Sequence, residues 1–295
     1  MIHLSPAVLR SEYVAPRFSP LGHMAGLPRF VKRFMWRTMD RKFMDPLYTA
    51  PFNQIRTKLG LAPVARMFHH WLHDASTALC MVPDWYCARQ PDWPQNMALT
   101  GFPLLAHEAG EPMPHAVAAF LGAGPAPVVI TAGTANAVSH AFFSAALQAC
   151  AMLEKRAIVV TADPRQLPPA LPPDAIHARY VAFEALLPRA AAFIHHGGIG
   201  SVSQALRAAT PQLIQPMAFD QFDNASRVVQ LGAGRELLPR HFQPDRVATE
   251  LAALLGAAAV QSDCRRHAAR LQHQDSISRA CDVLLDKLVP QLRPH

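Results

Sequence analysis

His195-His196-Gly197-Gly198-Ile199-Gly200-Ser201 is the stretch that decides how this 295-residue chain folds. It follows a short apolar run and precedes a segment with helical spacing, so it lies where a strand gives way to a helix. Three of the chain's 14 glycines fall within four positions here. Glycine lets a backbone approach a ligand closely, and the first turn of a helix offers free N–H groups and a positive dipole end. The stretch therefore predicts a loop that binds an anion, with a diphosphate as the natural guest.

Short apolar runs alternate with helical stretches on both sides of this loop, from residue 127 onward. The expected strands are 128–131, 157–161, 176–181, 191–195, 212–216 and 235–238. The expected helices are 139–153, 184–188, 201–209, 221–231, 245–255, 260–272 and 276–289. Such alternation is typical of a parallel sheet that helices cover on both faces, so it predicts a Rossmann-like α/β domain.

Polar residues follow the expected strands, where doubly wound sheets bind their ligands. Gly133 and Thr134 come after the first strand, and Asp220 and Gln221 come after the strand at 212–216. The last two side chains have acceptors and donors suited to sugar hydroxyls. His195 or His196 and the Ser201 hydroxyl are expected to donate hydrogen bonds to the diphosphate. Because no carboxylate cluster accompanies them, we expect neither a magnesium ion nor another cofactor.

Residues 1–105 have a different character, since they are irregular and rich in proline, aromatic residues and methionine. The segment 28–58 has eight basic residues and two acidic ones, which accounts for +6 of the net charge of +7. Its first part predicts an amphipathic helix over 28–45. Its aromatic residues either pack on the rest of the domain or form a cationic surface for contact with anionic lipid. No nucleic-acid motif accompanies the charge, so nucleic acid is not an expected partner.

The composition of the chain also excludes several classes of protein. Half of the residues are hydrophobic (51%) and 17% are charged, which excludes a disordered polypeptide. No apolar run reaches the ~18 residues of a membrane span, and the first residues do not resemble a secretory signal. The five cysteines are scattered, which predicts reduced thiols in a cytoplasmic protein. His69, His70 and His73 have helical spacing but no third ligand, so no metal site is expected there.

The glycine stretch, Pro211-Gln212 and the run Pro216–Ala225 together resemble the nucleotide-sugar signature of UDP-glycosyltransferase-type enzymes with the GT-B fold. Two further runs, Asp92–Gln95 and Thr100–Leu104, are similar to the rhamnosyltransferases of bacterial rhamnolipid synthesis. The likeness extends over nearly the whole sequence. It implies a metal-independent, inverting transfer of a hexosyl or deoxyhexosyl group from a dTDP- or UDP-sugar to a hydroxyl of a lipophilic acceptor.

The resemblance also implies a role for each site residue. A diphosphate-binding group would comprise His195, His196, Gly198, Gly200, Ser201, Gly133 and Thr134. Asp220 and Gln221 would contact the donor sugar. Tyr180 and Val181 would face the nucleobase, and Gln204 the ribose. Gln204 stands where many relatives have a glutamate, and Ala182-Phe183 replaces a common Pro-Gln or Pro-His.

In domain terms, the resemblance implies a complete nucleotide-sugar domain over 111–275. Residues 1–110 would be the remnant of an acceptor-binding domain with its linker, and the helix 276–295 would cross back to it. Family members have their catalytic base in a glycine-rich loop near the start of a full N-terminal domain, and no such loop is found here. We therefore expect an N-terminally truncated transferase whose catalytic residue is unassigned. The alternative is an inactive donor-binding module or half of a split enzyme. A cytoplasmic protein in peripheral contact with the membrane would fit the basic segment.

Overall fold

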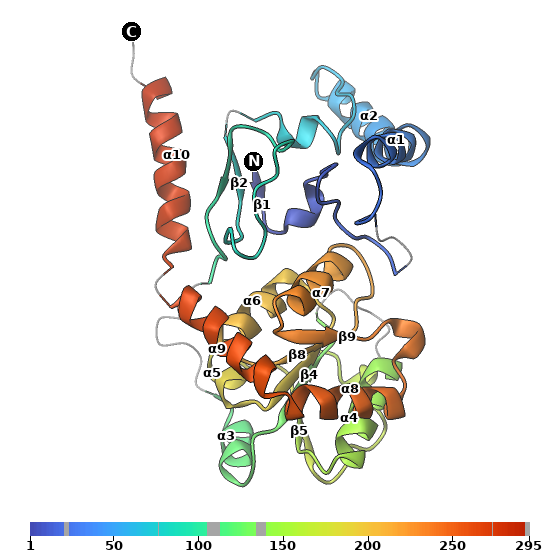
Figure 1. Cartoon of the computed structure of the whole chain (residues 1–295), viewed down its shortest axis with the longest axis vertical. Helices are drawn as coiled ribbons and strands as arrows, with labels where there is room; N and C mark the ends of the chain where they lie inside the picture. Colours follow the sequence, from blue (N-terminus) through green and yellow to red (C-terminus); the bar gives the residue numbers. More distant parts are fainter. Residues whose placement is uncertain (21–23, 76, 105–112, 134–139, 273, 293–295) are drawn as a thin grey trace. The chain divides into compact units, whose positions relative to one another are not determined.

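The computed structural model describes residues 1–20, 24–75, 77–104, 113–133, 140–272 and 274–292 (Figure 1). The chain divides into two compact units. The first comprises Met1–Pro103 and Asp275–His295, and the second comprises Leu104–Gln274. The expected boundary between residues 110 and 111 lies outside the described residues.

The second unit is built on a parallel six-stranded sheet with the order β6-β5-β4-β7-β8-β9. Its strands are β4 (Val128–Thr131), β5 (Ala157–Val160), β6 (Ala175–Ala178), β7 (Ala192–His195), β8 (Gln212–Ile214) and β9 (Gly234–Glu236). The sequence adds β5 and β6 on one side of β4, then continues with β7 on the other side. The order therefore reverses between β4 and β7, and this switch point is where open α/β sheets bind ligands.

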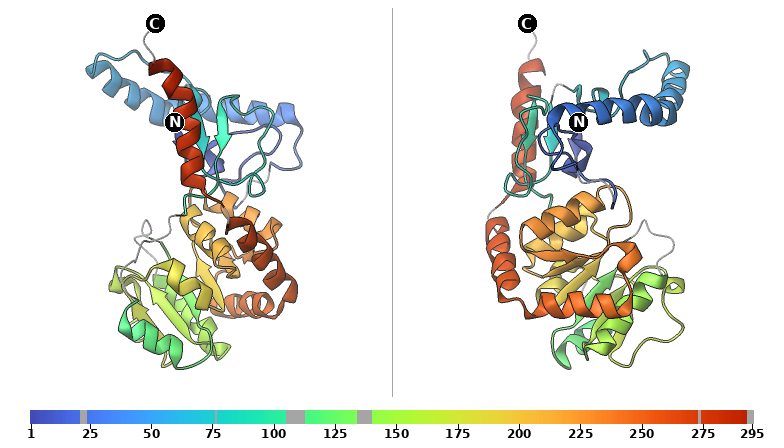
Figure 2. Two further views of the ribbon diagram at one scale, coloured as in Figure 1. Left: turned by 90° about the vertical axis from the view of Figure 1, so that its left-hand side faces the viewer. Right: turned by 45° about the vertical axis from the view of Figure 1, so that its right-hand side comes forward.

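Helices cover both faces of this sheet, as the left view of Figure 2 shows. The α-helices of the unit are α3 (His115–Gly122), α4 (His140–Met152), α5 (Phe183–Leu186), α6 (Ile199–Arg207), α7 (Gln221–Gln230), α8 (Pro244–Gly256) and α9 (Ala258–Leu271). Short 3₁₀ turns lie at η4 (Pro164–Gln166), η5 (Leu187–Arg189) and η6 (Pro239–His241). The expected helices are therefore present, although α6 begins two residues before its expected start at 201.

The two faces of β4 contribute to two separate cores, because successive strand side chains point to opposite sides. Val128 and Ile130 pack with apolar residues of α4 and α8, including the fully buried Phe143. Val129 packs on the other side with residues of α3, α5 and α6. Because both faces are covered, the first three residues of the strand are all apolar, which is the pattern that predicted it.

The first unit contains a small parallel sheet that the sequence did not predict. It consists of β1 (Ile2–His3), β2 (Ala78–Cys80) and β3 (Met97–Leu99), in that order. Ile2 pairs with Leu79, and Ala78 pairs with Met97. Strands of two or three residues are too short to give a recognisable alternation, so residues 1–105 were expected to be irregular.

The basic segment forms a longer helical stretch than the sequence predicted. Helix α1 (Arg29–Met39) continues as the π-helical stretch η2 (Asp40–Thr49) and then as α2 (Ala50–Lys58). Pro46 lies within η2, where the wider hydrogen-bonding pattern accommodates a residue that lacks an N–H. The expected end at residue 45 is therefore wrong. Short 3₁₀ turns complete the unit at η1 (Pro6–Val8) and η3 (Trp71–His73).

The last helix, α10 (Ser276–Leu292), packs within the first unit. Ala280 lies in a small core with Leu79 and Met81, and the Ser276 hydroxyl donates to the carbonyl of Phe102. These contacts join the last helix to β2. Among the described residues, no helix is long and apolar enough to cross a membrane.

Candidate functional site

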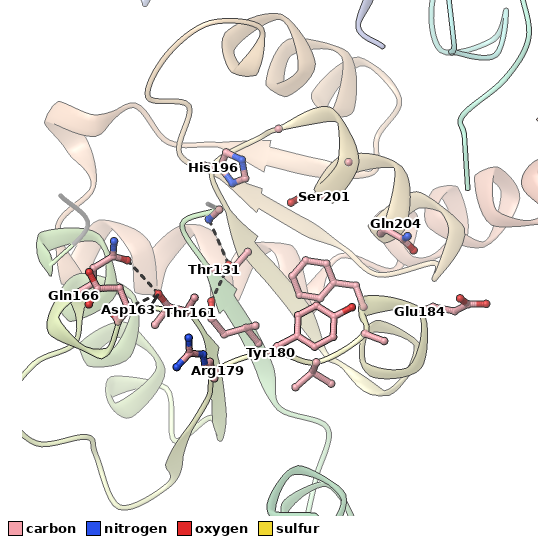
Figure 3. Close-up of a pocket in the computed structure, with 18 residues that line it drawn as sticks. Thr131, Thr161, Asp163, Gln166, Arg179, Tyr180, Glu184, His196, Ser201 and Gln204 are labelled. Atoms are coloured by element: carbon pink, nitrogen blue, oxygen red, sulfur yellow. Dashed lines mark hydrogen bonds between the residues drawn. The ribbon is translucent and has the colours of Figure 1, made fainter. Parts of the chain in front are cut away.

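The second unit has a pocket of about 640 Å³ beyond the carboxyl ends of its central strands (Figure 3). This volume is within the range of small-molecule sites. Its walls come from the ends of β4 and β5, from the segment that joins β6 to α5, and from the first turns of α6. The lining residues are Thr131, Gly133, Val160, Thr161, Ala162, Asp163, Gln166, Arg179, Tyr180, Val181, Ala182, Phe183, Glu184, His196, Gly198, Gly200, Ser201 and Gln204.

The start of α6 forms one wall of the pocket. Gly198 is the N-cap, and the first N–H that bonds within the helix is that of Val202, which donates to the Gly198 carbonyl at 3.0 Å. The preceding N–H groups, those of Ile199, Gly200 and Ser201, belong to the first turn, which has no carbonyl of its own helix to bond. Gly200 and Ser201 both line the pocket, so this wall presents donors and a positive dipole end.

His196 lies between two of the glycines. A Cβ on Gly133 would be 2.4 Å from His196 Cε1, and a Cβ on Gly198 would be 2.4 Å from His196 Nε2. Both distances are far below van der Waals contact. The two glycines therefore make room for the imidazole ring, a packing reason that adds to the expectation that glycines admit the ligand. Gly133 also has φ +77°, a conformation that glycine adopts without strain.

The electrostatic state of His196 follows from its surroundings. Burial lowers the pKa of its imidazole to about 4, so the ring is neutral at pH 7. Its Nδ1 atom is buried and has no hydrogen-bond partner among the described residues. A neutral imidazole has one donor and one acceptor nitrogen. The ring is thus available to donate one hydrogen bond to a group in the pocket.

His195 occupies a different place from the one expected. It is fully buried and absent from the pocket wall, because it is the last residue of the central strand β7, whereas His196 belongs to the loop that follows. Its Nε2 lies 3.0 Å from Gln212 Oε1, and its Nδ1 accepts the Gly197 N–H at 3.1 Å. Burial lowers the pKa of His195 to about 3, which fits a neutral ring with Nε2 protonated. Both nitrogens are used within the fold, so His195 positions the loop.

Asn224 on α7 also holds the glycine loop. Its Nδ2 donates to the Gly197 carbonyl and to Asp220 Oδ2, both at 2.9 Å. Gly197 has φ +89°, and a Cβ there would come 2.8 Å from Ile214 Cγ2. The fully buried Asn224 therefore links the start of α7 to the loop beside His196. The sequence feature that could have identified Asn224 is its position inside the run Pro216–Ala225.

Asp220 and Gln221 do not line the pocket. Gln221 is buried, and its Oε1 accepts the N–H groups of Met217 and Ala218 at 2.8 and 3.0 Å. Its carbonyl oxygen thus shapes the turn before α7, which leaves the amide NH₂ as the group for an outside partner. Asp220 is half-buried at the start of the helix.

Three residues expected around the nucleoside do line the pocket: Tyr180, Val181 and Gln204. Tyr180 is 56% exposed, so its ring is free to stack on a flat ligand. Gln204 has a buried Oε1 without a hydrogen-bond partner among the described residues. Thr134, also expected here, lies outside the described residues.

Sequence reasoning missed the polar residues on the β5 side of the pocket, which Figure 3 shows with their hydrogen bonds. Thr131 Oγ1 donates to the Val160 carbonyl at 2.8 Å. Thr161 Oγ1 lies 3.2 Å from Gln166 Oε1. Asp163 forms a salt bridge with Arg165, which lowers the pKa of the Asp163 carboxyl. Single polar residues at the ends of short strands gave no spacing signal, although Thr131 and Thr161 are the last residues of two expected strands. The remaining members, Arg179 and Glu184, flank the expected Tyr180 and Val181.

The donor set of the pocket consists mainly of N–H, hydroxyl and amide groups. Among the residues that the structure describes, no three His, Cys, Asp or Glu side chains come together as ligands for a metal ion. The arrangement suits a ligand with anionic oxygens at the α6 end and a flat polar ring near Tyr180.

Comparison with known proteins gives one matching family model. Residues 144–282 match the model described as erythromycin biosynthesis protein CIII-like, C-terminal domain. Glycosyltransferase GtfE of Amycolatopsis orientalis is 31% identical over 229 residues, which cover 78% of this chain and 54% of that protein. The vancomycin aglycone glucosyltransferase of the same organism is 32% identical and covers the same shares. The chain thus spans about half the length of these curated relatives.

Solved structures give the same assignment for the fold. The glycotransferase of kitacinnamycin superposes with a TM-score of 0.68 at 22% identity, over 88% of this chain and 66% of that chain. A UDP-glucose:anthocyanidin 3-O-glucosyltransferase in complex with UDP superposes with a TM-score of 0.64 at 14% identity. That match covers 76% of this chain and 56% of the other.

Proposed function

We propose that this protein is a glycosyltransferase of the GT-B type and that its pocket holds the nucleoside diphosphate of a sugar donor. The observation that carries this proposal is the arrangement at the start of α6. Free N–H groups of the first helical turn face the same cavity as His196, which Gly133 and Gly198 hold in place. A diphosphate suits this arrangement because helix N-termini bind anionic oxygens.

The diphosphate would be bound by the backbone of Gly198, Gly200 and Ser201, the Ser201 hydroxyl and the neutral imidazole of His196. Gly133 would approach it from the end of β4, and Thr134 follows in sequence. These donors need no reorganisation when negative charge develops on the leaving diphosphate, so they favour its departure. In this proposal the protein's own donors stabilise that charge, and no metal ion is required.

The nucleoside would extend from the diphosphate toward the β6–α5 segment. Tyr180 would stack on the nucleobase, with Val181 beside it. Gln204 Oε1, which is buried without a partner among the described residues, would accept a hydrogen bond from a ribose hydroxyl. Such a bond would satisfy an oxygen whose desolvation otherwise costs about 1–3 kcal/mol. The base would be uracil or thymine, as in UDP- or dTDP-sugars.

The reaction would be transfer of a hexosyl or deoxyhexosyl group, with a rhamnosyl-like sugar as the proposed donor group. The oxygen of an acceptor hydroxyl attacks the anomeric carbon as the bond to the diphosphate breaks, with inversion, and the hydroxyl proton passes to a base. We assign no residue to that base. Asp220 and the Gln221 amide, which lie outside the pocket wall, would contact the sugar hydroxyls. The acceptor would be a lipophilic small molecule.

Calorimetry tests the binding of the nucleotide, and a transfer assay separately tests the transfer of the sugar. Titration of the protein with UDP and dTDP should show binding to one site, and the affinity should fall about tenfold or more in His196→Ala. The absence of binding by either nucleotide would overturn the proposal. Transfer from a dTDP- or UDP-sugar to a hydroxylated lipid would assign the full reaction to this protein. Binding without transfer would assign the alternative, a donor-binding module or half of a split enzyme.

We also propose that the helical stretch of residues 28–58 contacts an anionic membrane surface. Phe30, Phe34 and Phe43 are 73%, 69% and 64% exposed, so they do not pack on the rest of their unit. They share α1 and η2 with exposed cations such as Arg41. Apolar side chains beside positive charges match a bilayer of anionic lipids.

Lys32 does not belong to this surface, although the sequence placed it there. It is 3% exposed, and its Nζ donates to the Tyr13 carbonyl at 2.9 Å. Sedimentation with phosphatidylglycerol vesicles should show binding that Phe30→Ser/Phe34→Ser abolishes. Val229→Ser, at an exposed position of the other unit, should not change it. Equal binding by both variants would overturn the membrane proposal.

A further inference from the structure

A second cavity, of about 310 Å³, lies within the first unit. One wall is the loop after η1, a second is the carboxyl half of α1, and a third is the segment before η3. The unit containing it has no residue of the pocket described above. The residues around the cavity are Arg10, Ser11, Glu12, Arg33, Trp36, Arg37, Asp40, Arg66, His69 and Asp92.

The floor of this cavity is a buried ion pair beside an aromatic ring. Arg10 and Asp40 form a salt bridge, and their side chains are 6% and 8% exposed. The Arg10 guanidinium lies 5.1 Å above the ring of Trp36, which is itself buried. The Trp36 Nε1 donates to the Ser11 carbonyl at 3.4 Å. Because these side chains are buried and contact one another, the floor of the cavity has a fixed shape. A cluster of flexible side chains on the surface would not have one.

The other two acids of the cavity are also engaged. Glu12 makes a two-pronged salt bridge with Arg33, at 2.6 and 2.7 Å. Asp92 accepts the Ser11 hydroxyl at 2.8 Å and the Glu12 N–H at 2.6 Å. Each carboxylate therefore already has strong donors, and none is free to attract a cation.

Two arginines of the cavity have no such partner. Arg37 and Arg66 make no salt bridge to any carboxylate that the structure describes. The four arginines of the wall face three acids, which leaves one positive charge. His69 adds none at neutral pH, because burial and the nearby Arg66 lower its pKa.

We propose that this cavity binds the carboxylate of a small organic acid through Arg37 and Arg66. A guanidinium matches the planar pair of oxygens of a carboxylate with two parallel hydrogen bonds. The single excess charge suits a monoanion better than a phosphate dianion. The volume lies at the lower end of known ligand sites, so it holds the acid group and a short part of the molecule.

This site goes beyond the donor pocket, because its residues belong to the other unit and none of them is proposed to touch the nucleotide. The test uses octanoate as the probe, with octanol as its uncharged match and inorganic phosphate as the dianion. Ligand-observed NMR should show octanoate binding at least tenfold tighter than octanol or phosphate. Arg37→Gln/Arg66→Gln should weaken octanoate binding by about tenfold or more, since each charge-assisted bond lost is worth about that factor.

The matched control is Arg246→Gln/Arg265→Gln, which removes the same two charges from exposed positions outside the cavity. It should bind octanoate as the unchanged protein does. Both double variants should bind UDP with unchanged affinity. A failure of the carboxylate proposal can therefore be distinguished from a failure of the proposal that the other pocket binds the nucleotide of a sugar donor. Equal octanoate affinity in the two double variants would overturn the carboxylate site. Tighter binding of octanol or phosphate than of octanoate would overturn it as well.

Discussion

The imidazole of His196 lies where a side chain on Gly198 would be: a Cβ at Gly198 falls 2.4 Å from His196 Nε2. Gly198 itself has φ −61° and ψ 142°, which any residue adopts. Glycine is therefore required at this position by the histidine ring and not by the backbone. The relation makes the placement of His196 testable without changing the histidine.

Gly198→Ala should displace the His196 ring and weaken UDP binding by about tenfold, equivalent to about 1.4 kcal/mol of binding free energy. The free energy of unfolding should change by less than about 1 kcal/mol, because a side-chain tip can move aside. Calorimetry with UDP and urea unfolding measure the two quantities.

The cycle with His196→Ala separates displacement from simple blocking of the pocket. If Gly198→Ala acts by moving the His196 ring, it should cause little further loss of UDP affinity in a protein that already has His196→Ala. Gly256→Ala serves as the control, because a Cβ there meets nothing within 4 Å and lies outside the pocket. A full additional tenfold loss in the His196→Ala background would contradict the relation.

His195 predicts a pH dependence of stability. Its pKa is about 3 in the folded protein against an ordinary value of 6.5, so the unfolded state binds more protons between these values. The folded state is therefore favoured fully above pH 6.5 and loses that advantage as the pH falls toward 3. The contribution lost between pH 7 and pH 5 is on the order of 2 kcal/mol.

His195→Gln removes this titration, so its free energy of unfolding should fall less steeply between pH 7 and pH 5 than that of the unchanged protein. Urea unfolding at several pH values, followed by circular dichroism, measures both slopes. His241→Gln is the matched control, since this exposed histidine lies outside the core. Identical slopes for the unchanged protein and for His195→Gln would show that His195 is not buried as a neutral ring.

Gln204 predicts a preference for the ribose hydroxyls. Its buried Oε1 lacks a partner among the described residues, and a ribose hydroxyl would supply one. Gln204→Leu should therefore bind UDP about tenfold more weakly while binding 2′,3′-dideoxy-UDP as the unchanged protein does. Calorimetry with the two nucleotides on both proteins completes the cycle. An equal loss for both nucleotides would place the ribose elsewhere.

Phe143 predicts a large effect on the stability of the second unit. Its side chain is fully buried in the core that α4 and α8 form on one face of the sheet. Phe143→Ala should lower the free energy of unfolding by about 3–5 kcal/mol, through lost burial and the cavity left behind. Met152→Ala, at a position on α4 that is 55% exposed, should change it by less than about 0.5 kcal/mol. Urea unfolding of both variants and of the unchanged protein measures these free energies.

The sequence predicted the second unit well, and the GT-B type of α/β fold is confirmed by the structural neighbours. Strands such as β4 are buried on both faces, so they appear as short apolar runs between helices. The first unit was harder to predict, because β1 and β2 have only two and three residues. The π-helical stretch around Pro46 was missed for another reason: proline ordinarily ends a helix.

Pocket residues could be predicted where they belong to a motif with a recognisable spacing. They were harder to predict where the packing of the fold decides which side chains reach the pocket. The glycine loop and the residues around Tyr180, which the sequence singled out, line one pocket. His195 and His196 look equivalent in sequence, yet His195 ends the buried strand β7 and His196 begins the loop after it, and only His196 lines the pocket. Gln221 differs from the expectation because its carbonyl oxygen is used by the turn before α7.

The central claim is that the first turn of α6 binds the diphosphate of a nucleotide. Amide resonances of ¹⁵N-labelled protein test it most directly, with UDP and uridine as ligands that differ only in the diphosphate. We predict that the resonances of Ile199, Gly200 and Ser201 shift on addition of UDP and stay in place with uridine. Binding of UDP that leaves these three amides unmoved would contradict the account.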